Sequence, residues 1–146
     1  GGWSQVASQM ITEGKIMSID IKKMEPIKNV KFYNGDIFLN ETKSVAKKYF
    51  KSNLDVIVSD MAADTTGNKA LDSIRTNQLC ADVINFSKET LKPRGVLVSK
   101  IFMGEDFLEV KNLAKSTFNK VNFFKPESSR KESKETYLHC EILKSL

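Results

Sequence analysis

Cysteine, histidine and long apolar runs are scarce in this chain, and each shortage excludes a class of protein. The 146 residues include two cysteines, Cys80 and Cys140, and one histidine, His139. The cysteines lack metal or redox spacing, which favours free thiols in a reducing compartment over a disulfide scaffold. His139 lies in the apolar run "TYLHCEIL", which indicates a structural role, and no metal site is expected. No apolar run is long enough to cross a bilayer, so a membrane partner is not expected either.

The charge balance is mildly basic. Lysine and arginine total 23 against 18 acidic residues, a formal net charge of +5. This excess favours a polyanionic partner, although many basic proteins bind no nucleic acid. The length predicts a single domain over residues 1–146, long enough to bury a core.

Short β-branched runs alternate with longer helical stretches, which is typical of a mainly parallel sheet covered by helices on both faces. Strands are predicted over Lys15–Asp20, Val30–Asp36, Leu54–Asp60, Gly95–Phe102, Lys120–Pro126 and Thr136–Leu143. Helices are predicted over Trp3–Thr12, Glu41–Lys51, Lys69–Leu91 and Glu105–Phe118. A proline and a glycine in "LKPRG" are expected to end the third helix.

Polar side chains gather where the predicted strands end. Asp20, Asp36 and Asp60 each close a strand, and Lys100 lies near the end of the apolar run "GVLVSKIF". Ligands of open parallel sheets bind at the carboxyl ends of strands, so a site is predicted there. Helix caps and turn-forming aspartates are the alternative interpretation of each residue taken alone. A lysine in a buried strand also needs a charged partner, because burying an unpaired ammonium is costly.

The chain opens with "GGWSQVASQM", two glycines that lead directly into a predicted helix. Such a turn can cradle a nucleotide when a strand precedes it. No strand precedes it here, and two glycines ahead of a helix are also consistent with a remnant of cloning.

Several segments in order resemble the FtsJ/RrmJ family of ribosomal RNA large-subunit methyltransferases. They are "GGWSQ", the spacing of Asp20, Met24, Pro26 and Ile27, "GD" at 35–36, "VSDMA" at 58–62, "VSKIFMGEDF" at 98–107 and "KPESSRKESKETY" at 125–137. The resemblance covers essentially the whole chain, and the combination is far more specific than any single piece. It implies an α/β, Rossmann-like methyltransferase sheet of order 3-2-1-4-5-7-6 with an antiparallel last strand.

The family's first strand has no counterpart among the predicted strands. The neighbours of that strand would expose unpaired backbone without it. We therefore expect the chain to be part of a longer protein whose earlier portion supplies that strand, the first catalytic lysine and a basic arm.

The resemblance implies S-adenosyl-L-methionine as cofactor. Asp20 would accept hydrogen bonds from the ribose hydroxyls of the adenosyl group, and Asp36 would meet the adenine amino group. The turn that holds the methionine end would contain Gly1, Gly2 and Trp3.

The family's catalytic signature is a Lys-Asp-Lys-Glu tetrad, and Asp60, Lys100 and Glu135 match its last three members. Asp60 is also expected to contribute to the cofactor site. The two carboxylates would converge on Lys100 from neighbouring strands and so supply the opposite charge that a buried ammonium requires. A purely structural ion-pair cluster would satisfy the same electrostatics. Ala63 stands where the family usually has a proline, which affects the loop but removes no chemical group.

The implied reaction is methyl transfer to the 2′-oxygen of a uridine in large-subunit ribosomal RNA. The charged loop before Glu135 is predicted to contact the RNA, through Lys125, Arg130, Lys131 and Lys134, although a solvated surface loop is the alternative. A tRNA or mRNA cap substrate and a non-catalytic RNA- or nucleotide-binding relative remain open as alternatives. The protein is expected to be a monomer, in the cytoplasm or, in a eukaryote, in mitochondria.

Overall fold

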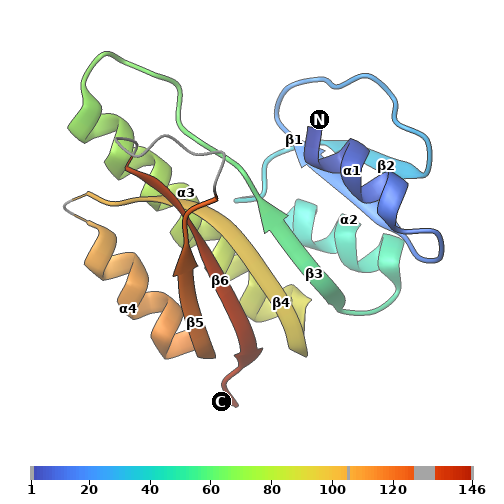
Figure 1. Ribbon diagram of the computed structural model, residues 1–146. Helices are drawn as coiled ribbons and strands as arrows, with labels where there is room; N and C mark the ends of the chain where they lie inside the picture. Colours follow the sequence, from blue (N-terminus) through green and yellow to red (C-terminus); the bar gives the residue numbers. More distant parts are fainter. Residues whose placement is uncertain (1, 105, 127–133, 146) are drawn as a thin grey trace. The chain divides into compact units, whose positions relative to one another are not determined.

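The computed structural model describes residues 2–104, 106–126 and 134–145 (Figure 1). The chain divides into two compact units, Gly1–Ser52 and Asn53–Leu146. The single domain predicted from the sequence over residues 1–146 stays a prediction. No helix within the described ranges is long and apolar enough to span a membrane.

The first unit contains two helices and a pair of parallel strands. The strands are in register from Ile16 opposite Val30 to Asp20 opposite Asn34. A hydrogen bond between the hydroxyls of Ser4 and Ser18 joins the first helix to the first strand. The elements are α1 (Gly2–Met10), β1 (Ile16–Asp20), β2 (Val30–Asn34) and α2 (Asn40–Phe50).

The second unit is a four-stranded mixed sheet of order β3-β4-β6-β5 with two helices (Figure 1). β3 runs parallel to β4, and β6 lies antiparallel between β4 and β5. This order and the antiparallel strand agree with the 4-5-7-6 part of the expected sheet. The elements are β3 (Leu54–Ser59), α3 (Lys69–Thr90), β4 (Leu91–Phe102), α4 (Phe107–Thr117), β5 (Phe118–Phe124) and β6 (Glu135–Leu143).

The core of the second unit lies on one face of this sheet. Leu97, Ile101 and Leu138 have no solvent-exposed surface, and they share their face because side chains alternate along a strand. The long helix α3 is attached to the last residue of β4 through Asn77. The Asn77 side chain donates to the Phe102 carbonyl and accepts from the Phe102 amide. The alternation that buries Ile101 turns Lys100 to the opposite face.

β4 begins four residues earlier than the sequence predicts, at Leu91 rather than Gly95. Leu54 pairs with Leu91, whereas Val56 pairs with Val96, so the register shifts across Pro93. A proline cannot donate to a sheet ladder, but it is tolerated where the ladder is interrupted. Helix α3 therefore ends before Pro93, as expected, but β4 begins before the proline rather than after it.

Candidate active site

Three charged side chains of the second unit meet at the end of its sheet. The Lys100 ammonium Nζ lies 3.1 Å from Asp60 Oδ1 and 3.4 Å from Glu135 Oε1. The Lys100 side chain is 13% exposed, whereas those of Asp60 and Glu135 are 42% and 30% exposed. The predicted convergence on Lys100 is confirmed, and two carboxylates around one ammonium leave a cluster with a net negative charge.

The strand registers place these groups. Ser59 pairs with Ser99, so Asp60 continues β3 beside Lys100. On the other side Lys100 pairs with Tyr137, and Phe102 pairs with Glu135. The cluster thus draws on three adjacent strands, which hold it more firmly than loops would.

Tyr137 belongs to this cluster, and sequence reasoning missed it. Its hydroxyl donates to Asp60 Oδ1 at 2.8 Å and approaches Glu135 Oε1 at 3.5 Å. Burial, followed by the hydrogen bond and charge of Asp60, raises the pKa of Tyr137 well above its ordinary value, so the hydroxyl stays a donor. The alternation of side chains along a strand could have identified it, because Tyr137 lies two residues after Glu135 on the same strand face.

The arrangement fixes the position of one ammonium group. Lys100 contacts two carboxylate acceptors, and the Tyr137 hydroxyl donates to the same Asp60 oxygen that contacts Lys100. The position of the ammonium is therefore constrained from several directions. An ammonium fixed in this way can orient a substrate hydroxyl or stabilise negative charge that develops on its oxygen.

The first unit holds the two aspartates that the sequence assigns to the cofactor. Asp20 Oδ1 accepts from the Lys22 amide at 3.0 Å, and Asp36 Oδ1 accepts from the Phe38 amide at 2.9 Å. The Gly35 amide donates to the Asp20 carbonyl and ties the two turns together. The turn-forming interpretation of both residues is therefore correct in part. Oδ2 of neither carboxylate accepts a hydrogen bond within the described part of the chain, so each keeps an acceptor for a ligand.

Of the other predicted site residues, the structure describes some and not others. Gly2 begins α1 and Trp3 follows it, with the Trp3 side chain exposed. Lys125 and Lys134 are exposed, and the Lys134 carbonyl accepts from the Met103 amide. Gly1, Arg130 and Lys131 lie outside the described residues.

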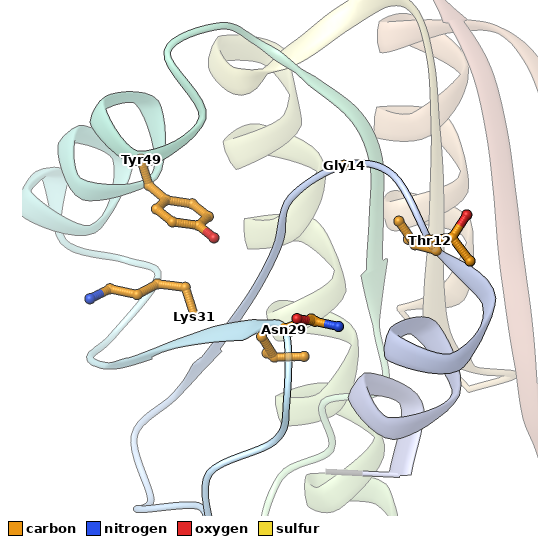
Figure 2. Close-up of a pocket in the computed structure, with 7 residues that line it drawn as sticks. Thr12, Gly14, Asn29, Lys31 and Tyr49 are labelled. Carbon is orange, nitrogen blue, oxygen red and sulfur yellow. The ribbon is translucent and has the colours of Figure 1, made fainter.

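A cavity of about 450 Å³ lies in the first unit, at the amino ends of β1 and β2 (Figure 2). The ammonium of Lys15 lies 5.2 Å from the centre of the Tyr49 ring, which forms part of the wall. Asp20 and Asp36 follow the opposite, carboxyl ends of the same strands, so this cavity is not the predicted cofactor site. Its lining residues are Ile11, Thr12, Gly14, Asn29, Val30, Lys31 and Tyr49.

The fold is that of Rossmann-like methyltransferases. The crystal structure of a protein named as a ribosomal RNA methyltransferase from Plasmodium falciparum superposes with a TM-score of 0.85 at 28% identity, over 98% of this chain and 81% of that one. Human methyltransferase-like protein 13 in complex with SAH gives a TM-score of 0.64 at 16% identity, over 93% of this chain and 64% of that one, and so shows the fold alone.

The chain belongs to the FtsJ-like methyltransferase family, whose sequence profile matches residues 1–142. The ribosomal RNA large subunit methyltransferase E of Pelagibacter ubique is 48% identical over 144 residues, 99% of this chain and 71% of that protein. The Rickettsia bellii protein of the same name is 44% identical over 144 residues, 94% of this chain and 63% of that protein. The family uses S-adenosylmethionine as methyl donor. The open acceptors on Asp20 and Asp36 fit a ligand that carries hydroxyl and amino donors.

Proposed function

We propose that this chain is the catalytic part of an enzyme that methylates the 2′-oxygen of a uridine in large-subunit ribosomal RNA. One observation carries the proposal. Lys100 projects from the end of a sheet strand and is held at 3.1 Å and 3.4 Å by carboxylates from two neighbouring strands. The family and the names of the relatives support a methyltransferase acting on ribosomal RNA.

Lys100 is the group that we assign to the reacting hydroxyl. S-adenosylmethionine supplies an activated methyl group when it is bound, so the protein's main task is to orient the ribose oxygen. Lys100 directs a lone pair of that oxygen and stabilises the charge that develops there, with Asp60 and Glu135 fixing its position. Tyr137 holds the Asp60 oxygen that faces Lys100.

The cofactor contacts are assigned to the first unit. Asp20 would accept from ribose hydroxyls and Asp36 from the adenine amino group, each through the oxygen that its turn does not use. Gly1, Gly2 and Trp3 would hold the methionine end, and Asp60 is proposed as a further cofactor contact.

The RNA contacts are assigned to the segment that precedes Glu135. Lys125 and Lys134 are exposed at the ends of that segment, next to β5 and β6. Arg130 and Lys131 complete the proposed set. Contacts of this kind would position phosphates without reading bases.

A methylation assay tests the substrate. Because the chain spans only 63% of the Rickettsia relative, the assay uses the whole protein that contains it. Large ribosomal subunits, naked ribosomal RNA, tRNA and capped RNA are compared as acceptors of labelled methyl groups. We expect label in large-subunit RNA within a linkage that resists alkaline hydrolysis, because a methylated 2′-oxygen cannot attack the adjacent phosphate.

Two results would contradict the proposal in different ways. A preference for tRNA or capped RNA would overturn the ribosomal substrate and keep the chemistry. Label in an alkali-labile product would overturn 2′-O transfer itself.

A further inference from the structure

An exposed aromatic ring lies directly beside the candidate active site. Phe124 at the end of β5 pairs with Tyr137 of β6, and their rings stack with centroids 5.6 Å apart and planes 24° apart. Tyr137 is 9% exposed, whereas Phe124 is 44% exposed. One side of the Phe124 ring thus covers the buried tyrosine, and a large part of its surface faces solvent.

The strand registers connect this ring to the charged cluster. Lys100, Tyr137 and Phe124 are paired across β4, β6 and β5, and Asp60 directly follows β3, whose last residue Ser59 pairs with Ser99. The four residues therefore form one row along this end of the sheet. The row runs from the carboxylate that holds Lys100, through the tyrosine whose hydroxyl donates to that carboxylate, to the exposed ring. A molecule that reaches Lys100 at this edge of the sheet comes within reach of Phe124.

The chemistry around Phe124 favours a nucleic-acid base as the ligand of this ring. Lys125 follows it directly, and Lys134 lies at the start of the neighbouring strand β6, so exposed cations flank an exposed aromatic face. Proteins bind single-stranded RNA by combining cations along the backbone with aromatic rings that stack on unpaired bases. A cross-strand aromatic pair that only stabilised the sheet would not require this exposure.

We propose that Phe124 is a stacking platform for an unpaired RNA base at or next to the nucleotide whose ribose reaches Lys100. This inference rests on the proposed function and extends it from the ribose to the base. Stacking is tolerant of sequence, because every base has an aromatic face, so Phe124 contributes affinity and base placement rather than base identity.

The test uses three substitutions at one position in the whole protein, with large ribosomal subunits from cells that lack the enzyme as substrate. Phe124→Ala removes the ring, Phe124→Leu keeps apolar bulk without an aromatic face, and Phe124→Trp keeps the aromatic face. Leu108→Ala, which removes an exposed apolar side chain of α4, is the matched control. We expect Phe124→Ala and Phe124→Leu to raise the KM for the subunits by about 5- to 150-fold, the loss of one base–aromatic stack.

The kcat at saturating substrate and the affinity for S-adenosylmethionine should remain near wild type in both variants, and Phe124→Trp should restore the KM. In Phe124→Trp, addition of subunits should also quench tryptophan fluorescence beyond any change in wild type.

Three outcomes would overturn the inference. A wild-type KM in Phe124→Ala shows that the ring contacts no RNA. A defect in Phe124→Ala that Phe124→Leu repairs shows apolar packing rather than stacking. A lower kcat with unchanged KM shows that the ring acts only on Tyr137. If wild type transfers no methyl to large subunits, the proposed substrate fails instead, and the same series is measured on the RNA that wild type does methylate.

Discussion

The two units of the chain differ sharply in how much they bury. Among the buried side chains of the described chain, Thr42 and Ala46 alone belong to residues 1–52. The rest lie in residues 53–146, where Ile84, Leu97 and Leu138 have no exposed surface. Both units expose large apolar side chains, such as Met10 in the first and Leu108 in the second. A small unit buries a smaller fraction of its surface than a larger one does, so the first unit gains less stability from burial.

This difference separates two kinds of functional residue. The Lys100 cluster stands on a well-buried sheet, which keeps its side chains in a fixed geometry before any substrate arrives. Asp20 and Asp36 stand on turns of the weakly buried unit. A ligand that binds only the folded state stabilises it, so cofactor binding should stabilise the first unit more than the second.

Loss of Lys100 should have the largest effect of the changes considered, and this effect should fall mainly on turnover. We expect Lys100→Met to lower the single-turnover methylation rate by about 10²–10⁴-fold, because a positioned acid–base or orienting group contributes this much. Breaking a fully buried pair costs roughly 3–5 kcal/mol. Asp60 and Glu135 are partly exposed and can be hydrated, so we expect a smaller loss of stability than for a fully buried pair.

Lys92→Met is the matched control for this change. Lys92 lies on the same strand and pairs with Asp55 at 2.9 Å, but both side chains are exposed. Its loss should leave both rate and stability nearly unchanged. A folded, cofactor-binding Lys100→Met protein with a normal single-turnover rate would remove Lys100 from the chemistry.

Alkaline pH should destabilise the second unit selectively. Burial raises the pKa of Cys80 from 9.0 to about 11, and burial followed by the charge of Cys80 raises the pKa of Cys140 to about 12. Unfolding therefore releases protons above pH 9, so the free energy of unfolding should be intact below pH 9 and fall as the pH rises toward 11–12.

We expect these thiols to account for a loss on the order of 2–4 kcal/mol between pH 8 and pH 10.5. Denaturant unfolding under reducing conditions measures this loss in wild type and in a Cys80→Ala/Cys140→Ala variant. Region-resolved hydrogen exchange should show the alkaline loosening in α3 and β6, since the first unit contains no cysteine. An identical pH dependence in the double variant would contradict the role of the thiols.

Substitution of Asp20 or Asp36 should weaken cofactor binding, with a smaller effect than the loss of turnover expected for Lys100→Met. We expect Asp20→Ala and Asp36→Ala each to reduce the affinity for S-adenosylmethionine by about tenfold to a hundredfold, the loss of a hydrogen bond to a charged acceptor. Calorimetry on the whole protein measures the affinity, and the fold should be retained.

The variants Asp20→Asn and Asp36→Asn distinguish a role in cofactor binding from a role in forming the turn. In Asp20→Asn the side-chain carbonyl oxygen can still accept from the Lys22 amide, but an NH2 group replaces the second oxygen and cannot accept from a ribose hydroxyl. We expect Asp20→Asn to weaken binding nearly as much as Asp20→Ala, whereas Glu13→Ala, at an exposed carboxylate of the same unit, should not. Wild-type affinity in both asparagine variants would show that the aspartates only form turns.

Much of the fold could be predicted from the sequence because its signals are local. β-branched runs bounded by glycine, proline and aspartate predicted every strand of the described chain to within a few residues, except that β4 begins early. That error arose because a proline usually interrupts a strand, whereas here the register shift from Val56 paired with Val96 to Leu54 paired with Leu91 accommodates it. Lys100 was also identifiable, since an ammonium within an apolar strand requires a partner.

The sequence by itself determined the order of elements, the family and the demand for charges near Lys100. Only the tertiary structure decided which atoms meet that demand, because Asp60, Lys100 and Tyr137 are far apart along the chain and come together through strand register. The same registers place Tyr137 on Asp60 and stack Phe124 on Tyr137. Hydrophobic periodicity records which side chains are buried, but the pairing of distant strands depends on the packing of the whole sheet.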